Sequence, residues 1–149
     1  MMKNTIIATF VALMGVFGAN AQLDIESGAK VEFEKDVHDY GSLIQGEPAV
    51  YEFKFTNTGN EPLIISNSRG SCGCTVPSWP REPIAPGKSA SIKVKYDSNR
   101  LGPINKSVTI TSNALDNPTK VIRIKGNIAP KPANAAPTNN DSPMAPKAN

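Results

Sequence analysis

Residues 50–56 read Val-Tyr-Glu-Phe-Lys-Phe-Thr, and this alternation decides the fold class. In an extended chain, successive side chains point to opposite sides. Tyr51, Phe53 and Phe55 therefore share one face, while the charged residues share the other. Three aromatic rings on one face form a large apolar patch that must pack against a second layer. The segment predicts a half-buried strand in a layered β domain.

The same period of two recurs along the chain, and turns rich in glycine, proline and asparagine separate the repeats. One-face alternation is typical of antiparallel sheets, and two such sheets pack together as a sandwich. We therefore expect an all-β fold, an immunoglobulin-like antiparallel β-sandwich of about seven strands. A small barrel is the alternative. The clearest strand segments are 30–37, 50–56, 62–66, 89–96, 106–112 and 119–125.

The beginning of the chain predicts export. Residues 1–21 combine a positive charge at Lys3, an apolar run over 5–17 and a small-x-small site at 19–21, which is the pattern of a cleaved secretory signal peptide. The apolar run is shorter than the about 20 residues that a membrane-spanning helix needs. We expect a periplasmic or secreted protein with no membrane span in the mature chain.

The end of the chain differs in composition from the β domain. Residues 129–149 are rich in proline, alanine and asparagine, and Met144 is their one large apolar side chain. Such a segment buries too little apolar surface to offset the entropy that is lost on ordering. We therefore expect a disordered tail at 129–149 and place the folded domain at residues 22–128.

The charge pattern argues against nucleic acid as a partner. The formal net charge is +3, and lysines alternate with acidic residues rather than forming a basic stripe. With His38 as the one histidine and no glycine-rich phosphate loop after a strand, the sequence contains no recognisable catalytic constellation. We expect a protein that is not an enzyme.

Chemistry is suggested at one segment, Cys72-Gly73-Cys74, which holds both cysteines of the chain. In a flat strand their Cα atoms lie about 6.6 Å apart at ~3.3 Å per residue, near the upper limit for a disulfide. Gly73 is expected to bend the chain and bring them closer. Closing so short a loop stabilises a fold by only about 1.6 kcal/mol, so a disulfide here suits redox exchange better than stabilisation.

Two other interpretations of Cys72 and Cys74 stay open. Two thiolates on one face bind soft ions such as Cu(I), and a zinc ion would need further ligands, for which His38 is the one histidine. A copper or zinc ion is the only cofactor that this pattern suggests. Alternatively, both cysteines are small, buried and inert. Nearby, Arg69 and Trp79 are candidate partner contacts, although Arg69 also fits a turn cap and Trp79 a lid on the core.

Several motifs taken together resemble one family. They are Asp39-Tyr40-Gly41, residues 53–63 (Phe-Lys-Phe-Thr-Asn-Thr-Gly-Asn-Glu-Pro-Leu), Ser71-Cys72-Gly73-Cys74-Thr75, Ile84-Ala85-Pro86-Gly87 and Ile124-Lys125-Gly126. The pattern is similar to DUF1573, a family of secreted bacterial proteins of unknown function, over residues 31–127. That family is similar to Hydin-type and major-sperm-protein-type domains, so the resemblance implies an immunoglobulin-like sandwich used for binding or scaffolding. It implies no activity and no catalytic residues.

The sequence is therefore compatible with two functions. The first is an exported, non-catalytic binding or scaffold module, whose partner we expect to be an envelope or extracellular protein. The second is a thiol-redox or soft-metal-handling protein that acts through Cys72 and Cys74. The two hypotheses differ in whether the cysteine pair takes part in the function or is only part of the domain.

Overall fold

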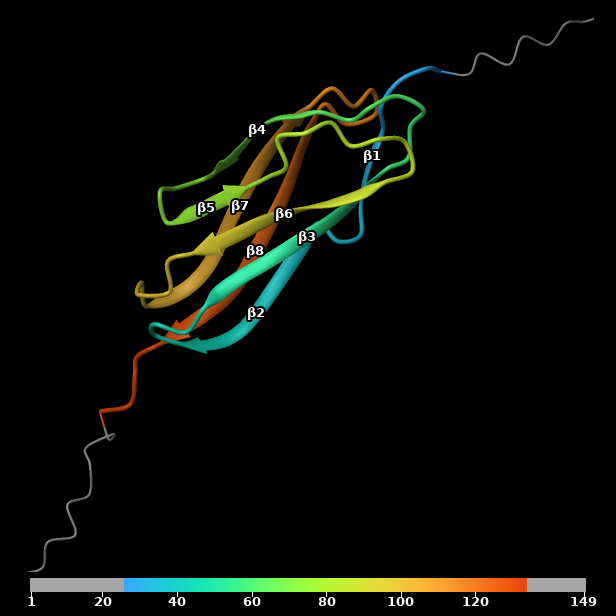
Figure 1. Cartoon of the computed structure of the whole chain (residues 1–149). Helices are drawn as coiled ribbons and strands as arrows, with labels where there is room; N and C mark the ends of the chain where they lie inside the picture. Colours follow the sequence, from blue (N-terminus) through green and yellow to red (C-terminus); the bar gives the residue numbers. More distant parts are fainter. Residues whose placement is uncertain (1–25, 134–149) are drawn as a thin grey trace, which may run out of the picture.

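The computed structural model describes residues 26–133, which form two four-stranded sheets that face one another (Figure 1). The first sheet has the strand order β1-β3-β6-β5, and the second has the order β2-β8-β7-β4. Two separate sheets make the fold a sandwich and not a barrel. The strands are β1 (Val31–Phe33), β2 (Val37–Ile44), β3 (Ala49–Asn57), β4 (Ile65–Gly70), β5 (Thr75–Ser78), β6 (Ser89–Tyr96), β7 (Gly102–Ser112) and β8 (Thr119–Ala129).

The structure has eight strands, where the alternation predicts about seven. The expected strand at 30–37 is interrupted, because residues 34–36 separate β1 from β2, and β7 begins at Gly102 rather than at 106. Further differences lie on either side of the cysteines. The strand expected at 62–66 begins only at Ile65 and continues to Gly70, and β5 includes the first residues of the expected proline-rich loop. Pairing with β7 and β6 sets these bounds, and local alternation does not reveal such long-range pairing.

The expected signal peptide at 1–21 and most of the expected tail at 129–149 lie outside the described residues. β8 extends to Ala129, whose carbonyl oxygen accepts a hydrogen bond from the backbone N–H of Gln45 at 2.9 Å. Within residues 26–133, no helix is long and apolar enough to cross a bilayer.

One strand pair differs from the expected antiparallel arrangement. β2 pairs with β8 in parallel, whereas the other five pairs are antiparallel. Only residues 34–36 separate β1 from β2, so β2 keeps the direction of β1 while the chain crosses to the second sheet. A bulge interrupts the β2 register at Gly41, where φ is 66° and the N–H donates to the Asp39 carboxylate at 2.8 Å.

The core lies between the inner faces of the two sheets. The expected inward faces are confirmed, because Phe53 and Phe55 of β3 are buried while the intervening Lys54 is exposed. The same alternation holds along β6, β7 and β8. The largest fully buried apolar side chains are Phe53, Phe55, Leu63, Ile92, Val94, Val108, Ile110, Ile122, Ile124 and Ile128.

A buried amide holds one end of this core together. Asn57, the last residue of β3, has a relative exposure of 0%. Its Nδ2 donates to the carbonyl oxygens of Glu61 at 2.7 Å and Ile84 at 2.9 Å, and its Oδ1 accepts from the backbone N–H of Gly59 at 3.0 Å. Asn57 therefore joins the end of β3 to the turn that follows it and to the loop before β6.

Replacing Asn57 tests this role. We expect Asn57→Ala to lower the free energy of unfolding by at least about 2 kcal/mol, because it removes the hydrogen bonds to Glu61, Ile84 and Gly59 and empties a fully buried side-chain position. Urea unfolding of the variant measures the loss. Asn67→Ala is the control, because Asn67 is exposed on β4, and it should change stability by no more than about 0.5 kcal/mol. Equal losses in the two variants would contradict the structural role of Asn57.

Candidate functional site

The cysteines lie in the turn where the chain passes from one sheet to the other. β4 and β5 are edge strands of different sheets, and they run side by side at one edge of the sandwich (Figure 1). Cys72 and Cys74 form a disulfide in this turn, with Cα atoms 5.3 Å apart. The turn is closed by a hydrogen bond from the Thr75 N–H to the Cys72 carbonyl oxygen at 3.2 Å.

The glycine between the cysteines does not have the expected role. Gly73 has no positive φ, and a Cβ atom built on it would meet nothing within 4 Å. An ordinary turn therefore brings the cysteines together, without the backbone freedom of glycine. The constrained position is Gly70, where a Cβ would collide with the backbone carbonyl oxygen of Thr75. Gly70 allows β4 and β5 to approach each other at this edge.

The two sulfur atoms have different surroundings. Cys74 is buried at 3% exposure, whereas Cys72 is only partly buried. The backbone N–H of Cys74 donates to Cys72 Sγ at 3.3 Å, and the Thr75 hydroxyl lies 3.7 Å from Cys72 Sγ and 3.8 Å from Cys74 Sγ. Disulfide sulfurs carry no hydrogen, so the single hydroxyl hydrogen of Thr75 is shared between these two weak contacts. Of the two cysteines, Cys72 is therefore the more exposed residue.

A hollow of about 410 Å³ borders the disulfide on the side of β4, and we call it the edge hollow. Hydroxyl groups and backbone make up much of its lining, with Arg69 as its one charged residue. Its lining residues are Ser68, Arg69, Gly70, Ser71, Cys72, Gly73, Thr75, Val76 and Pro77.

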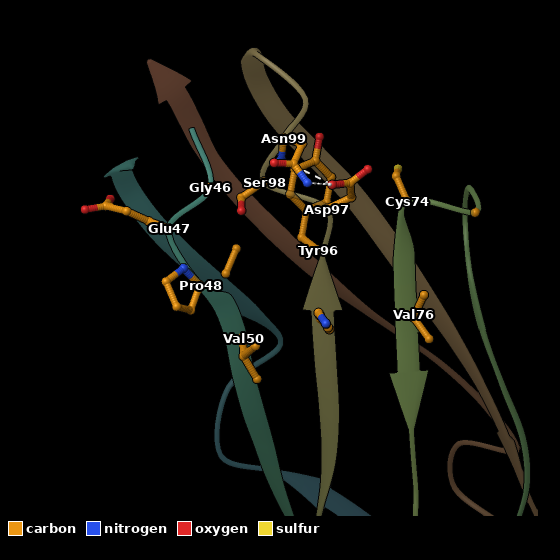
Figure 2. Close-up of a pocket in the computed structure, with 13 residues that line it drawn as sticks. Gly46, Glu47, Pro48, Val50, Cys74, Val76, Tyr96, Asp97, Ser98 and Asn99 are labelled. Atoms are coloured by element: carbon orange, nitrogen blue, oxygen red, sulfur yellow. Dashed lines mark hydrogen bonds between the residues drawn. The ribbon is translucent and has the colours of Figure 1, made fainter. Parts of the chain in front are cut away.

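A larger groove of about 740 Å³ lies on the other side of the same turn (Figure 2). It covers the ends of β3, β6 and β5 in the first sheet, and we call it the sheet-end groove. Gly73 and Val76 line both hollows, so the disulfide turn separates them. The lining residues are Gly46, Glu47, Pro48, Ala49, Val50, Gly73, Cys74, Val76, Lys95, Tyr96, Asp97, Ser98 and Asn99.

A row of three side chains crosses the sheet-end groove. Val50 of β3 and Val76 of β5 each lie opposite Lys95 of β6 in the strand register. The two valines have relative exposures of 43% and 58%, on a sheet face whose other positions are mostly polar. The groove therefore presents two apolar side chains on either side of a lysine, all three on strands of one sheet.

The acidic groups at the rim of the groove already have partners. The Glu47 carboxylate accepts from the N–H of Ile44 at 2.7 Å. The Asp97 carboxylate accepts from the backbone N–H of Asn99 at 3.2 Å (Figure 2). It also lies 3.6 Å from the Arg100 guanidinium. Lys95 has no ion pair within residues 26–133, so its ammonium group is available to a ligand.

The structure does not bring His38 to the cysteines. His38 lies on β2, and two strands separate β2 from β4 in the second sheet. Its ring stacks on Tyr51 with centroids 3.6 Å apart, and burial together with Lys35 lowers its pKa below the usual value. Burial also raises the pKa of the neighbouring Tyr40 to about 12. Within residues 26–133, no three potential metal ligands gather at one place.

The two candidate contact residues differ in their surroundings. Arg69 is exposed and lines the edge hollow. Trp79 follows β5 and packs against the core, with the Arg81 guanidinium 4.0 Å from its ring centroid. Its Nε1 is buried without a hydrogen-bond partner in the described part of the chain. Of these two residues, Arg69 lies next to the disulfide hollow, and Trp79 covers the core.

Sequence reasoning missed the valines of the groove and Thr75. One signal was present: Val50 falls in phase with Glu52 and Lys54, on the face where the alternation places polar side chains. No comparable signal marks Thr75 or Val76. Their positions depend on the pairing of β5 with β6, which the sequence does not show.

Comparison with known families matches residues 31–128 to DUF1573, described as a protein of unknown function. No curated protein matches the chain. A similar solved structure is a protein of unknown function from Porphyromonas gingivalis W83, with 20% identity and a TM-score of 0.61 over 73% of this chain and 51% of that one. This chain thus spans about half the length of that protein.

Two other similar structures come from proteins of different kinds. One is the ASH/PapD-like domain of human CEP192, with 10% identity and a TM-score of 0.57 over 87% of this chain and all of that one (100%). The other is the VesB protease of Vibrio cholerae, with 14% identity and a TM-score of 0.52 over 68% of this chain and 32% of the protease. At such identities the likeness concerns the fold alone, and it confirms the immunoglobulin-like sandwich.

The two glycines of the cysteine turn give a matched pair of substitutions. We expect Gly70→Ala to destabilise the fold by about 1–3 kcal/mol, because its methyl group overlaps the Thr75 backbone. Gly73→Ala should change stability by no more than about 0.5 kcal/mol, because its methyl group enters open space. Chemical denaturation of both variants measures the difference. A larger loss for Gly73→Ala than for Gly70→Ala would contradict this description of the turn.

Proposed function

Because this chain belongs to the DUF1573 family, whose description gives no function, we propose from its geometry that it is an exported, non-catalytic binding module. Its sheet-end groove takes a segment of an envelope or extracellular protein. The signal-peptide pattern of residues 1–21 supports export. The row formed by Val50, Lys95 and Val76 is the observation that supports binding most directly.

The groove has the features of a recognition surface rather than of a reaction centre. Apolar side chains that stay exposed to water on a sheet face are unfavourable. A partner segment that covers them removes this surface from water and so stabilises the complex. Backbone pairing with β6 fixes the positions of all three residues of the row, so the surface is formed before a partner binds.

The charges of the groove select the chemistry of the partner. Contacts within the domain occupy Glu47 and Asp97, whereas Lys95 has no ion pair in the part of the chain that the structure describes. The partner is therefore a protein segment that carries apolar side chains next to a carboxylate. The carboxylate pairs with Lys95, and the apolar side chains cover Val50 and Val76.

Pull-down from envelope extract tests this function. The double variant Val50→Asp with Val76→Asp is expected to lose the proteins that the wild-type domain retains, because it places two carboxylates where the apolar contacts lie. Val121→Asp is the control, since Val121 is an equally exposed valine (43%) on the other sheet. Recovery of the same proteins by all three forms, or of no specific protein by the wild type, would contradict the proposal.

A second candidate function is thiol–disulfide exchange, and the unequal exposure of the two cysteines favours it. An external thiolate attacks Cys72 Sγ, the S–S bond breaks, and its electron pair stays on Cys74 Sγ as a thiolate. Cys72 then carries a mixed disulfide. In the reverse step the Cys74 thiolate attacks Cys72 Sγ, and the external group leaves as a thiolate. Donation by the Thr75 hydroxyl stabilises negative charge on Cys74.

Single-cysteine variants test the direction of this exchange. We expect Cys74→Ser, which keeps the accessible Cys72 thiol, to form a mixed disulfide with glutathione disulfide faster than Cys72→Ser, which keeps the buried one. Mass spectrometry over time measures both rates. In the wild type, thiols should titrate only after reduction. Equal rates in the two variants, or free thiols before reduction, would exclude this candidate function.

A further inference from the structure

The described part of the chain ends at the mouth of the sheet-end groove. Lys131 and Pro132 line a shallow hollow together with the turn at 46–48, and the same turn lines the groove. Figure 1 shows the end of β8 beside this turn, which connects β2 to β3. The residues that follow 133 therefore start next to the groove.

We propose that residues 141–146 of this chain, Asp-Ser-Pro-Met-Ala-Pro, occupy the sheet-end groove and compete there with the partner segment. The inference rests on the groove being the binding site of the proposed function. It identifies one occupant of that site and, with it, a way in which the chain regulates its own binding.

The chemistry of residues 141–146 matches that of the groove. A polyproline II segment, which Pro143 and Pro146 favour, has three residues per turn, so Asp141 and Met144 lie on one side of it, about 9 Å apart at ~3.1 Å per residue. Across the groove, Val50 and Val76 lie on the two strands that flank the strand of Lys95, each neighbouring strand ~4.8 Å away. The spacing from Asp141 to Met144 is larger than that from Lys95 to either valine, so the long Lys95 side chain takes up the difference and reaches the Asp141 carboxylate while Met144 covers a valine.

The length of the connecting chain permits this contact. Eight residues lead from 133 to 141, and they span about 25 Å at ~3.1 Å per residue. A tether of this length gives a local concentration on the order of millimolar. A weak contact is therefore enough to fill the groove for part of the time, and a tighter partner displaces it.

Backbone amide NMR spectra test the contact without a partner. The chain from Gln22 to Asn149 is compared with a variant that ends at Ala133 and keeps every described residue. We expect the amide signals of Val50, Val76 and Lys95 to differ between the two forms. Superimposable groove signals would overturn the proposal. A difference that disappears on dilution would overturn it as well, because the tail would then bind a second molecule.

Substitutions in the tail identify the residues responsible. Met144→Lys and Asp141→Lys are each expected to give the groove spectrum of the shortened form, whereas Asn139→Lys, outside the segment, should leave the full-length spectrum unchanged. Lys95→Glu should also release the tail, and combining it with Asp141→Lys should restore the contact. Equal effects of the Asn139 and Met144 variants, or no recovery in the charge-reversed pair, would contradict the proposed contact.

The test is independent of whether a partner exists. A tail-dependent shift together with a pull-down that recovers no protein would refute the proposed function and leave the tail contact standing. A successful pull-down with superimposable spectra would do the reverse. If both are correct, the form that ends at Ala133 should recover more of the partner than the longer chain, because the competing segment is gone.

Discussion

The buried Asn57 amide is the constraint on which the assembly of this end of the sandwich depends. A primary amide without exposed surface destabilises a fold unless its donors and acceptor are bonded. Its partners come from the turn after β3 and from the loop before β6, so these segments must assemble together. The aromatic face of β3 contributes two of the largest fully buried side chains, Phe53 and Phe55, while Asn57 joins the end of that strand to the backbone groups around it.

The sequence predicts the fold where the information is local. The faces of β3, β6, β7 and β8 follow from alternation, because each has one buried side. β4 and β5 are short edge strands with little alternation, so only their neighbours define them. The conformation of the turn after Asn57 also depends on neighbouring segments and cannot be predicted from local sequence. Gly59 has no positive φ there, and it is small because a Cβ would meet the Gly28 carbonyl oxygen.

The site is predictable in part for the same reason. The spacing of Cys72 and Cys74 marks the place where chemistry is available, and both lie in one turn. The turn itself depends on Gly70, because a side chain there would prevent β4 and β5 from approaching each other at the sandwich edge. This approach cannot be predicted from the local sequence. The groove likewise needs β6 to align Val50 with Val76. The chemistry is therefore visible in the sequence, whereas its surroundings follow from tertiary pairing.

The parallel pairing of β2 with β8 also has a mechanical consequence. The chain enters the second sheet at the start of β2 and leaves the domain at the end of β8. Because the two strands are parallel, these points lie at opposite ends of the pair. A force applied between the start of β2 and the end of β8 therefore acts along the two strands in opposite directions. It loads the hydrogen bonds of the ladder together in shear, whereas an antiparallel terminal pair would open one bond at a time.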